Sequence, residues 1–208
     1  FERPYVDTKS IRDVFASPEA TTLSRQLALE SMTLLKNEGG LLPLRGNLKT
    51  VAVIGPIANS VRCLLGDYNY VAFTEGVVGM VWSLAKDLNA DLSQLGDFVA
   101  YHAAAFKDYL EPPDEDSLTR QNYRMASILQ GTEFAVGKGV NVTYAKGCRA
   151  IGNDTSGFQE AVAVARRADV AIMVVGGKSG LDNTCTCGET RDSASVALPG
   201  VQQELLEA

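Results

Sequence analysis

The sequence predicts a layered α/β/α sandwich with a mostly parallel sheet and a helical insertion. Three observations support this fold class. Apolar runs at residues 51–54, 140–145 and 169–175 are strand-like. The first lacks the alternation of polar and apolar residues that is typical of a strand with one face exposed to water. Helix-like segments separate the strands, and connections of that length imply parallel crossovers. A polar loop follows the third strand, where open α/β sheets place their chemistry.

The first element predicted is a helix that begins after Ser17. Ser17 is a favourable N-cap, Pro18 suits the first helical position, and Glu19 complements the helix dipole. Leucines recur near the helical period and extend this helix to about Asn37: Leu23, Leu27, Leu34 and Leu35. We therefore expect an interdomain linker and first helix over residues 1–45, and the sandwich over residues 46–208.

A helical insertion is predicted over residues 75–125, after the first strand. Two apolar stripes at helical spacing occupy its first part, and a proline-rich acidic break follows at residues 111–116. A further helix is predicted over residues 117–136. Trp82, Tyr101 and His102 could face a sugar, but aromatic residues at this spacing usually belong to a core.

Strand and helix signals alternate after Gly139. Residues 140–145 form the second predicted strand, and residues 157–168 form a helix whose apolar face consists of Phe158, Ala161, Val162 and Ala165. Residues 169–175 form the third strand. Pro199 begins another helix, in which the sequence stops, and we therefore expect an internal piece of a longer protein with an open sheet edge.

Composition excludes several function classes. The net charge of −6, with no basic stripe, argues against nucleic acid, and no apolar run approaches the roughly 20 residues of a membrane span. Gly177-Lys-Ser179 resembles the end of a phosphate loop, but Ile172 occupies the position of its first glycine. Nothing in the sequence indicates a cofactor.

The four cysteines are Cys63, Cys148, Cys185 and Cys187. Cys185 and Cys187 have one residue between them, whereas paired zinc ligands usually have two to four, and a second ligand pair is missing. We therefore expect no metal site. Free thiols are the favoured state, and a local disulfide remains the alternative.

The loop at residues 180–193, followed by Leu198-Pro-Gly-Val-Gln-Gln203, carries a family resemblance. It is similar to glycoside hydrolase family 3, the β-glucosidases and β-xylosidases, whose second domain has Gly-Glu-x-x-Asp-Arg ahead of Leu-Pro-Gly-x-Gln. Other segments resemble the family in the same order: Ser31-Met-Thr-Leu-Leu-Lys-Asn37, Leu41-Leu-Pro-Leu44, Val51-Ala-Val-Ile-Gly-Pro56, Leu65-Gly-Asp-Tyr68 and Val142-Thr-Tyr-Ala-Lys-Gly-Cys148.

The resemblance implies a two-domain active site. Glycoside cleavage needs two carboxyl groups, about 5–5.5 Å apart in retaining enzymes. In the resembled family an N-terminal barrel supplies an aspartate nucleophile, and Glu189 matches the acid/base glutamate. Asp182 is a weaker candidate, and we expect Asp192 to hold the loop through backbone hydrogen bonds. Ser193 stands where the family has arginine, and Arg191 could substitute for it.

The expected function is therefore that of the second domain of a retaining β-glycosidase, cleaving terminal β-linked glucose or xylose and inactive without its barrel. The alternative is a non-catalytic module that binds carbohydrate or stabilises a partner. The resemblance implies an extracellular or periplasmic location. Two N-glycosylation patterns are present, at Asn141 in a predicted strand and at Asn153 in a predicted loop.

Overall fold

The structure is a computed structural model that describes residues 2, 5, 7–10, 13, 17–44, 47–69, 72, 76, 125–180, 185–189 and 192–208. Most of the predicted insertion lies outside these residues, together with Trp82, Tyr101 and His102. The chain divides into two compact units, Phe1–Gly46 and Asn47–Ala208.

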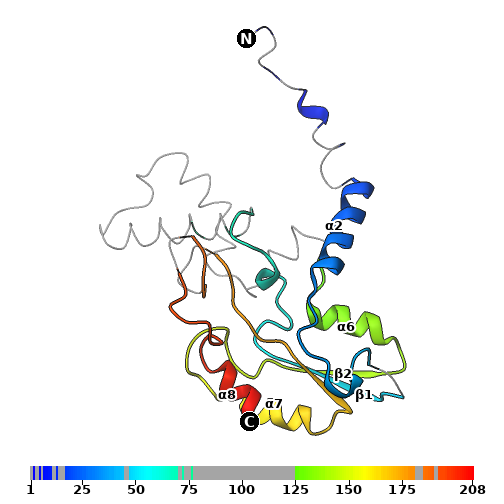
Figure 1. The fold of residues 1–208 in the computed structure, drawn as a ribbon, viewed down its shortest axis with the longest axis vertical. Helices are drawn as coiled ribbons and strands as arrows, with labels where there is room; N and C mark the ends of the chain where they lie inside the picture. The colour runs from blue at the N-terminus through cyan, green and yellow to red at the C-terminus, as the bar shows by residue number, and fades with distance from the viewer. Residues whose placement is uncertain are drawn as a thin grey trace, which may run out of the picture. The chain divides into compact units, whose positions relative to one another are not determined.

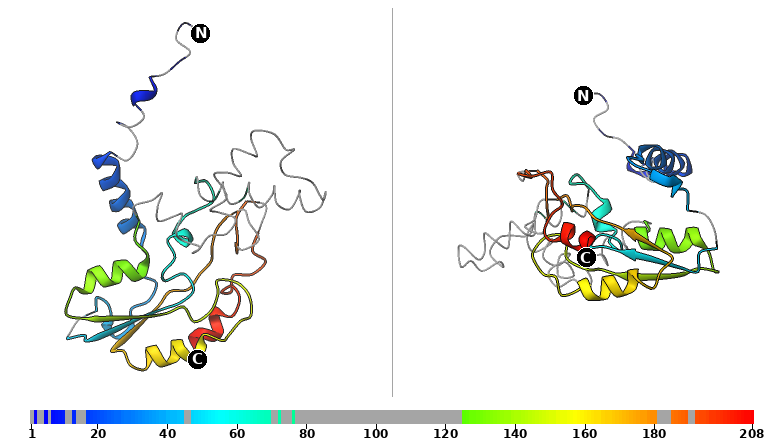
Figure 2. Two further views of the ribbon diagram at one scale, coloured as in Figure 1. Left: turned by 180° about the vertical axis from the view of Figure 1, so that it is seen from behind. Right: turned by 60° about the horizontal axis from the view of Figure 1, so that its bottom comes forward.

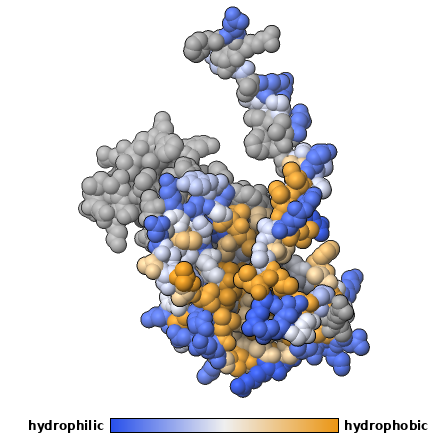
Figure 3. Space-filling model, viewed as in Figure 1, coloured by the Kyte–Doolittle hydropathy of each residue, from blue (hydrophilic) through white to orange (hydrophobic). Residues whose placement is uncertain are grey.

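The first unit contains the helix α2, Pro18–Ser31, between two short 3-10 helices, Thr8–Ser10 and Glu38–Gly40. The Ser17 hydroxyl accepts a hydrogen bond from the backbone N–H of Ala20 at 3.1 Å, as a good N-cap does. Figure 3 shows apolar side chains along α2, and none of its residues is buried.

The helix α2 ends at Ser31, so the predicted extension to Asn37 is wrong. Met32 takes an extended backbone conformation, and the leucines that continued the helical period, Leu34 and Leu35, are exposed. In the last turn the Ser31 hydroxyl donates to the carbonyl of Ala28 at 2.9 Å. Local side-chain bonds of this kind offer the backbone an alternative to a continued helix.

The second unit contains a parallel sheet of three strands, in the order β2-β1-β3. The strands are β1, Thr50–Ile54, β2, Asn141–Ala145, and β3, Val170–Met173. Val51 of β1 is in register with Val142 and with Val170. The central strand β1 is buried from Val51 to Ile54, which confirms the prediction made from its lack of alternation.

Helices cover both faces of this sheet (Figure 1). The helix α6, Ile128–Val136, lies on one face, and α7, Phe158–Ala165, and α8, Gln202–Glu207, lie on the other (Figure 2). Ala52 and Ile54 of β1 belong to the core on the side of α7 and α8, whereas Val51 and Val53 belong to the core on the side of α6. The predicted layered α/β/α sandwich with a parallel sheet is thus confirmed.

Several predicted boundaries need correction. The helix α6 begins at Ile128, and residues 125–127 before it are not helical, because Ser127 and Gln130 form a capping box. The predicted helix over residues 117–136 therefore wrongly included residues 125–127. The helix α7 ends at Ala165, three residues before the predicted end, and β3 ends at Met173, not at residue 175.

The carboxyl end of β1 lies very close to the backbone that leaves β3. Val174 donates its backbone N–H to the carbonyl of Ile54 at 2.7 Å. Gly55 has a φ of 138°, and a β-carbon there would collide with the Val174 carbonyl group. Only glycine fits this conformation and this space, so Gly55 allows the two loops that follow β1 and β3 to start side by side.

Among the described residues, no helix is both long enough and apolar enough to cross a membrane.

Candidate active site

Two loops at the carboxyl edge of the sheet build the candidate active site. One follows β1 through a 3-10 helix, Arg62–Leu64, to Asp67 and Tyr68. The other follows β3 and reaches Glu189. Because β1 and β3 are parallel neighbours, their carboxyl ends share one edge, and ligands bind outside such edges in open α/β sheets.

Asp67 joins the two loops. Its Oδ2 accepts a hydrogen bond from the backbone N–H of Glu189 at 2.8 Å, and its Oδ1 accepts one from the hydroxyl of Ser179. Hydrogen bonds to a carboxylate are stronger than neutral ones. One side chain from the β1 loop therefore holds the β3 loop at two points, ten residues apart.

The β3 loop is also folded back on itself. The backbone N–H of Thr186 donates to the carbonyl of Lys178 at 2.8 Å, and that of Gly180 donates to the carbonyl of Cys187 at 3.1 Å. Gly188, with a φ of 145°, lies against Asp67, and a β-carbon there would collide with the carbonyl of Gly180. The glycine before Glu189 therefore has a steric reason to be glycine.

The side chain of Glu189 is exposed and accepts a hydrogen bond from Tyr68. The Tyr68 hydroxyl donates to Glu189 Oε2 at 3.1 Å. This hydrogen bond, and next the charge of the Glu189 carboxylate, raise the pKa of Tyr68 above its usual value. The Glu189 carboxylate therefore lies at the loop surface. One of its oxygens accepts from the Tyr68 hydroxyl, and the Glu189 backbone is held by Asp67.

A comparison with protein families identifies the family of this chain. The model of the glycosyl hydrolase family 3 C-terminal domain matches residues 32–208. The chain belongs to glycosyl hydrolase family 3. The resemblance inferred from the sequence is thus confirmed.

Curated relatives agree with this assignment. A β-xylosidase from Formosa agariphila is 29% identical over 98% of this chain, and a probable exo-1,4-β-xylosidase from Aspergillus terreus is 31% identical over 92%. These matches cover 21% and 17% of the two relatives, so the chain spans about one fifth of their length.

Among solved structures, the fold resembles a β-glucosidase involved in saponin metabolism from intestinal bacteria. The TM-score is 0.61 at 24% identity, over 97% of this chain and 24% of that one. At this identity the likeness supports the fold alone.

The structure does not assign a site role to the other candidate residues of the β3 loop. Asp182 and Arg191 lie outside the described residues. Within the described part of the chain Asp192 accepts no hydrogen bond, so the prediction that it holds the loop is wrong. Asp67 holds the loop instead. Ser193, at the family's arginine position, donates its hydroxyl locally to the carbonyl of Ser195 at 2.6 Å.

Sequence reasoning did not select Asp67 or Tyr68 as site residues. They lie about 120 positions before Glu189, and only the pairing of β1 with β3 brings them to it. One signal was available, since both are polar residues that follow the first strand, and parallel strands end at a common edge.

The four cysteines all lie among the described residues, and no disulfide joins any two of them. Cys185 is buried and Cys187 is exposed. The local disulfide left open by the sequence is therefore not formed in this structure. Over the described residues, no group of three histidine, cysteine or acidic side chains is arranged to hold a metal ion.

Proposed function

We propose that this chain is the second domain of a retaining β-glycosidase and that Glu189 is its general acid/base. The observation that carries the proposal is the Glu189 carboxylate itself, exposed at the carboxyl edge of the sheet and oriented by Tyr68 at 3.1 Å, with its backbone held by Asp67 at 2.8 Å. A group that transfers protons must be reachable by substrate and fixed in position, and this carboxylate is both.

The reaction then proceeds in two steps across two domains. A carboxylate nucleophile on a separate barrel domain attacks the anomeric carbon, while Glu189 gives its proton to the leaving oxygen. Glu189, now ionised, takes a proton from water, and that water releases the sugar from the nucleophile. The proposal assigns one of the two carboxyl groups to this chain and the other to the barrel.

The Tyr68 hydrogen bond has a place in both steps. A phenol that donates to one carboxylate oxygen leaves the other oxygen to exchange the proton with substrate or water. Tyr68 therefore acts as a positioning residue for the Glu189 carboxylate.

β-Xylosides are the first substrates to assay. The two curated relatives named above are β-xylosidases, and their names support terminal β-linked xylose ahead of glucose. We also propose a secreted or periplasmic protein, since oligomeric glycosides are commonly met outside the cell.

The proposal is tested by replacing Glu189 with glutamine in the full-length protein. The amide keeps the shape and loses the acid. Hydrolysis of xylobiose, whose leaving group needs protonation, should fall by about 10²–10⁴-fold, whereas an aryl xyloside with a good leaving group should lose much less in the first step. If xylobiose hydrolysis stays within a factor of a few of the wild type, Glu189 is not the acid.

A further inference from the structure

A second site lies at the carboxyl ends of β1 and β2, beside the Glu189 loop. A pocket of about 660 Å³ opens there, and its wall contains three cationic side chains, Lys146, Arg149 and Lys178, with Asp154 as its carboxylate. The chain as a whole carries a net charge of −6. The pocket therefore concentrates positive charge on an otherwise acidic protein, which favours an anionic ligand.

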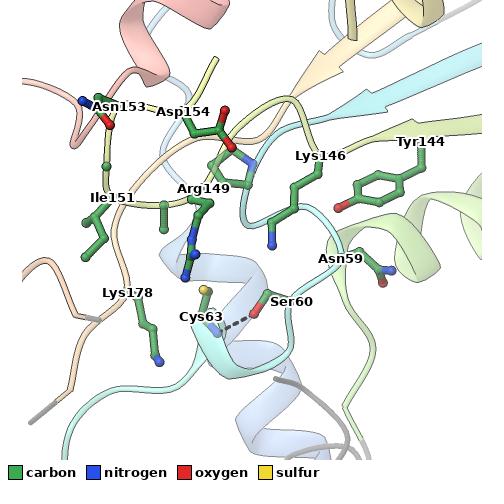
Figure 4. Close-up of a pocket in the computed structure, with 13 residues that line it drawn as sticks. Asn59, Ser60, Cys63, Tyr144, Lys146, Arg149, Ile151, Asn153, Asp154 and Lys178 are labelled. Atoms are coloured by element: carbon green, nitrogen blue, oxygen red, sulfur yellow. Dashed lines mark hydrogen bonds between the residues drawn. The ribbon is translucent and has the colours of Figure 1, made fainter. Parts of the chain in front are cut away.

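The cations occupy defined positions in the wall. In Figure 4 the side chains of Lys146 and Arg149 extend from the loop after β2 toward Ser60 and Cys63 on the opposite wall. Lys178 is only 4% exposed and comes from the loop after β3. Within the described part of the chain, neither Lys146 nor Arg149 forms an ion pair with a carboxylate.

Asp154 does not neutralise this group of cations. Its Oδ1 accepts a hydrogen bond from the backbone N–H of Ser156 at 2.9 Å. The hydrogen bonds from Ser156, and to a smaller extent the charge of Arg149, hold the pKa of Asp154 below its usual value. With Asp154 ionised, the two cations Lys146 and Arg149 still outnumber this one carboxylate of the wall.

Gln202 holds the loop that carries Lys146 and Arg149 in place. This fully buried side chain donates from Nε2 to the carbonyl of Ala150 and to that of Gly176, both at 2.8 Å. Its Oε1 accepts from the backbone N–H of Gly176 at 2.8 Å. The loops after β2 and β3 are thus tied to each other and to α8, so the pocket is largely preformed, as ligand sites usually are.

The remaining side chains of the pocket wall are suited to bind the uncharged hydroxyl groups of a sugar ring. It presents hydroxyl and amide groups of the kind that bind sugar hydroxyls: Asn59, Ser60, Tyr144 and Asn153. The volume lies within the range of small-molecule sites, roughly 300–1,000 Å³. Charge-assisted hydrogen bonds from lysine and arginine are the strong contacts that such a wall can make with a carboxylate or phosphate.

We propose that this pocket binds an anionic sugar, a carbohydrate that bears a carboxylate or a phosphate group. Lys146 and Arg149 bind the anionic group, and the amide and hydroxyl side chains bind the ring hydroxyls. Lys178 connects the pocket to the candidate active site, because its backbone N–H and carbonyl both hydrogen-bond to Thr186 in the Glu189 loop. A ligand here therefore contacts the segment that holds the proposed acid/base, but the inference does not depend on catalysis by Glu189.

The test is calorimetric titration of the full-length protein with glucuronate, glucose 6-phosphate, glucose and inorganic phosphate. Glucuronate or glucose 6-phosphate should bind, more weakly as salt rises, and the tighter of the two identifies the anionic group. The double variant Lys146→Met/Arg149→Met should lose about 10-fold or more in that affinity. Equal binding of glucose, or phosphate binding as tight as that of both sugar anions, would overturn the proposal.

The matched control is Lys138→Met/Arg166→Met, which removes the same charge from two exposed positions that do not line the pocket. Its affinity should stay close to that of the wild type, and an equal loss in both double variants would contradict a specific site. Glu189→Gln should bind the sugar anion as the wild type does even if it is inactive. This arm separates failure of the pocket from failure of the proposed acid/base.

Discussion

Asp67 Oδ2 accepts the backbone N–H of Glu189 at 2.8 Å, across 122 positions of sequence. The same carboxylate accepts the hydroxyl of Ser179 through its other oxygen. The position of the proposed acid/base is therefore fixed by a residue from a different loop. Asp67 makes structural contacts, and it affects the proposed proton transfer by holding the backbone of Glu189 in position.

Replacing Asp67 with alanine should reduce kcat/KM of the full-length enzyme toward a β-xyloside by about 10–100-fold, since one charged hydrogen bond contributes about 1.5–3 kcal/mol. Asp67→Asn keeps one acceptor and should lose less. Ser179→Ala, which removes one of the two contacts, should lose least. Steady-state kinetics together with circular dichroism checks the order, and an unchanged rate in folded Asp67→Ala would refute the anchoring role.

The pKa of Tyr68 provides a test of the contact between Tyr68 and Glu189. Ionising Tyr68 breaks its hydrogen bond and places two negative charges side by side, which is why its pKa is raised. In Glu189→Gln the charge repulsion disappears, so the Tyr68 pKa should fall. Ultraviolet titration of each protein against its own Tyr68→Phe partner measures this one phenol. An equal or higher Tyr68 pKa in Glu189→Gln would mean that the two side chains are not in contact.

The buried amide of Gln202 should contribute strongly to stability. Gln202→Leu leaves the N–H and carbonyl of Gly176 and the carbonyl of Ala150 without their partner, and a buried unsatisfied group costs about 1–3 kcal/mol. We expect a loss of about 2–4 kcal/mol in the free energy of unfolding, measured by urea denaturation. Gln203→Leu is the matched control: this neighbour is exposed and bonds only to Glu207 in its own helix, so its change should be small.

Asp169 makes the start of the sheet sensitive to acid. Its Oδ2 accepts the backbone N–H groups of Thr50 at 2.8 Å and Lys49 at 2.7 Å, and these bonds lower its pKa. A carboxyl group with a lowered folded-state pKa adds stability above its unfolded value, about 3.9, and loses that contribution as pH falls through the folded-state pKa. Asp169→Asn should therefore be less stable than the wild type at neutral pH, and the two should converge in acid. A difference that does not shrink in acid would contradict this role.

The fold could be read from the sequence to the extent that it depends on local pattern. The apolar run at Val51–Ile54 and the cap at Ser17 act within a few residues, and both appear in the structure as predicted. The end of α2 was misjudged because the spacing of leucines alone does not show where the backbone leaves the helical conformation, which it does at Met32. The start of α6 was missed because the capping box at Ser127 was not recognised.

The candidate site could be predicted only in part. Glu189 was selected because it matches a family motif, which is local in sequence. Asp67, Tyr68 and the pocket beside Lys178 depend on which strands pair, and that is set by packing across the whole unit. Gln202 was visible as part of a motif, but its function of tying the loops after β2 and β3 together is a property of the folded chain.

The most direct test of the acid/base assignment is chemical rescue of Glu189→Gln in the full-length enzyme. With an activated aryl β-xyloside the first step continues, and the covalent intermediate should accumulate because its hydrolysis needs a general base. Azide needs no base, so it should restore turnover and yield the β-xylosyl azide. Asp192→Asn should show normal turnover without rescue. Absence of both rescue and azide product in an otherwise folded Glu189→Gln would contradict the central claim.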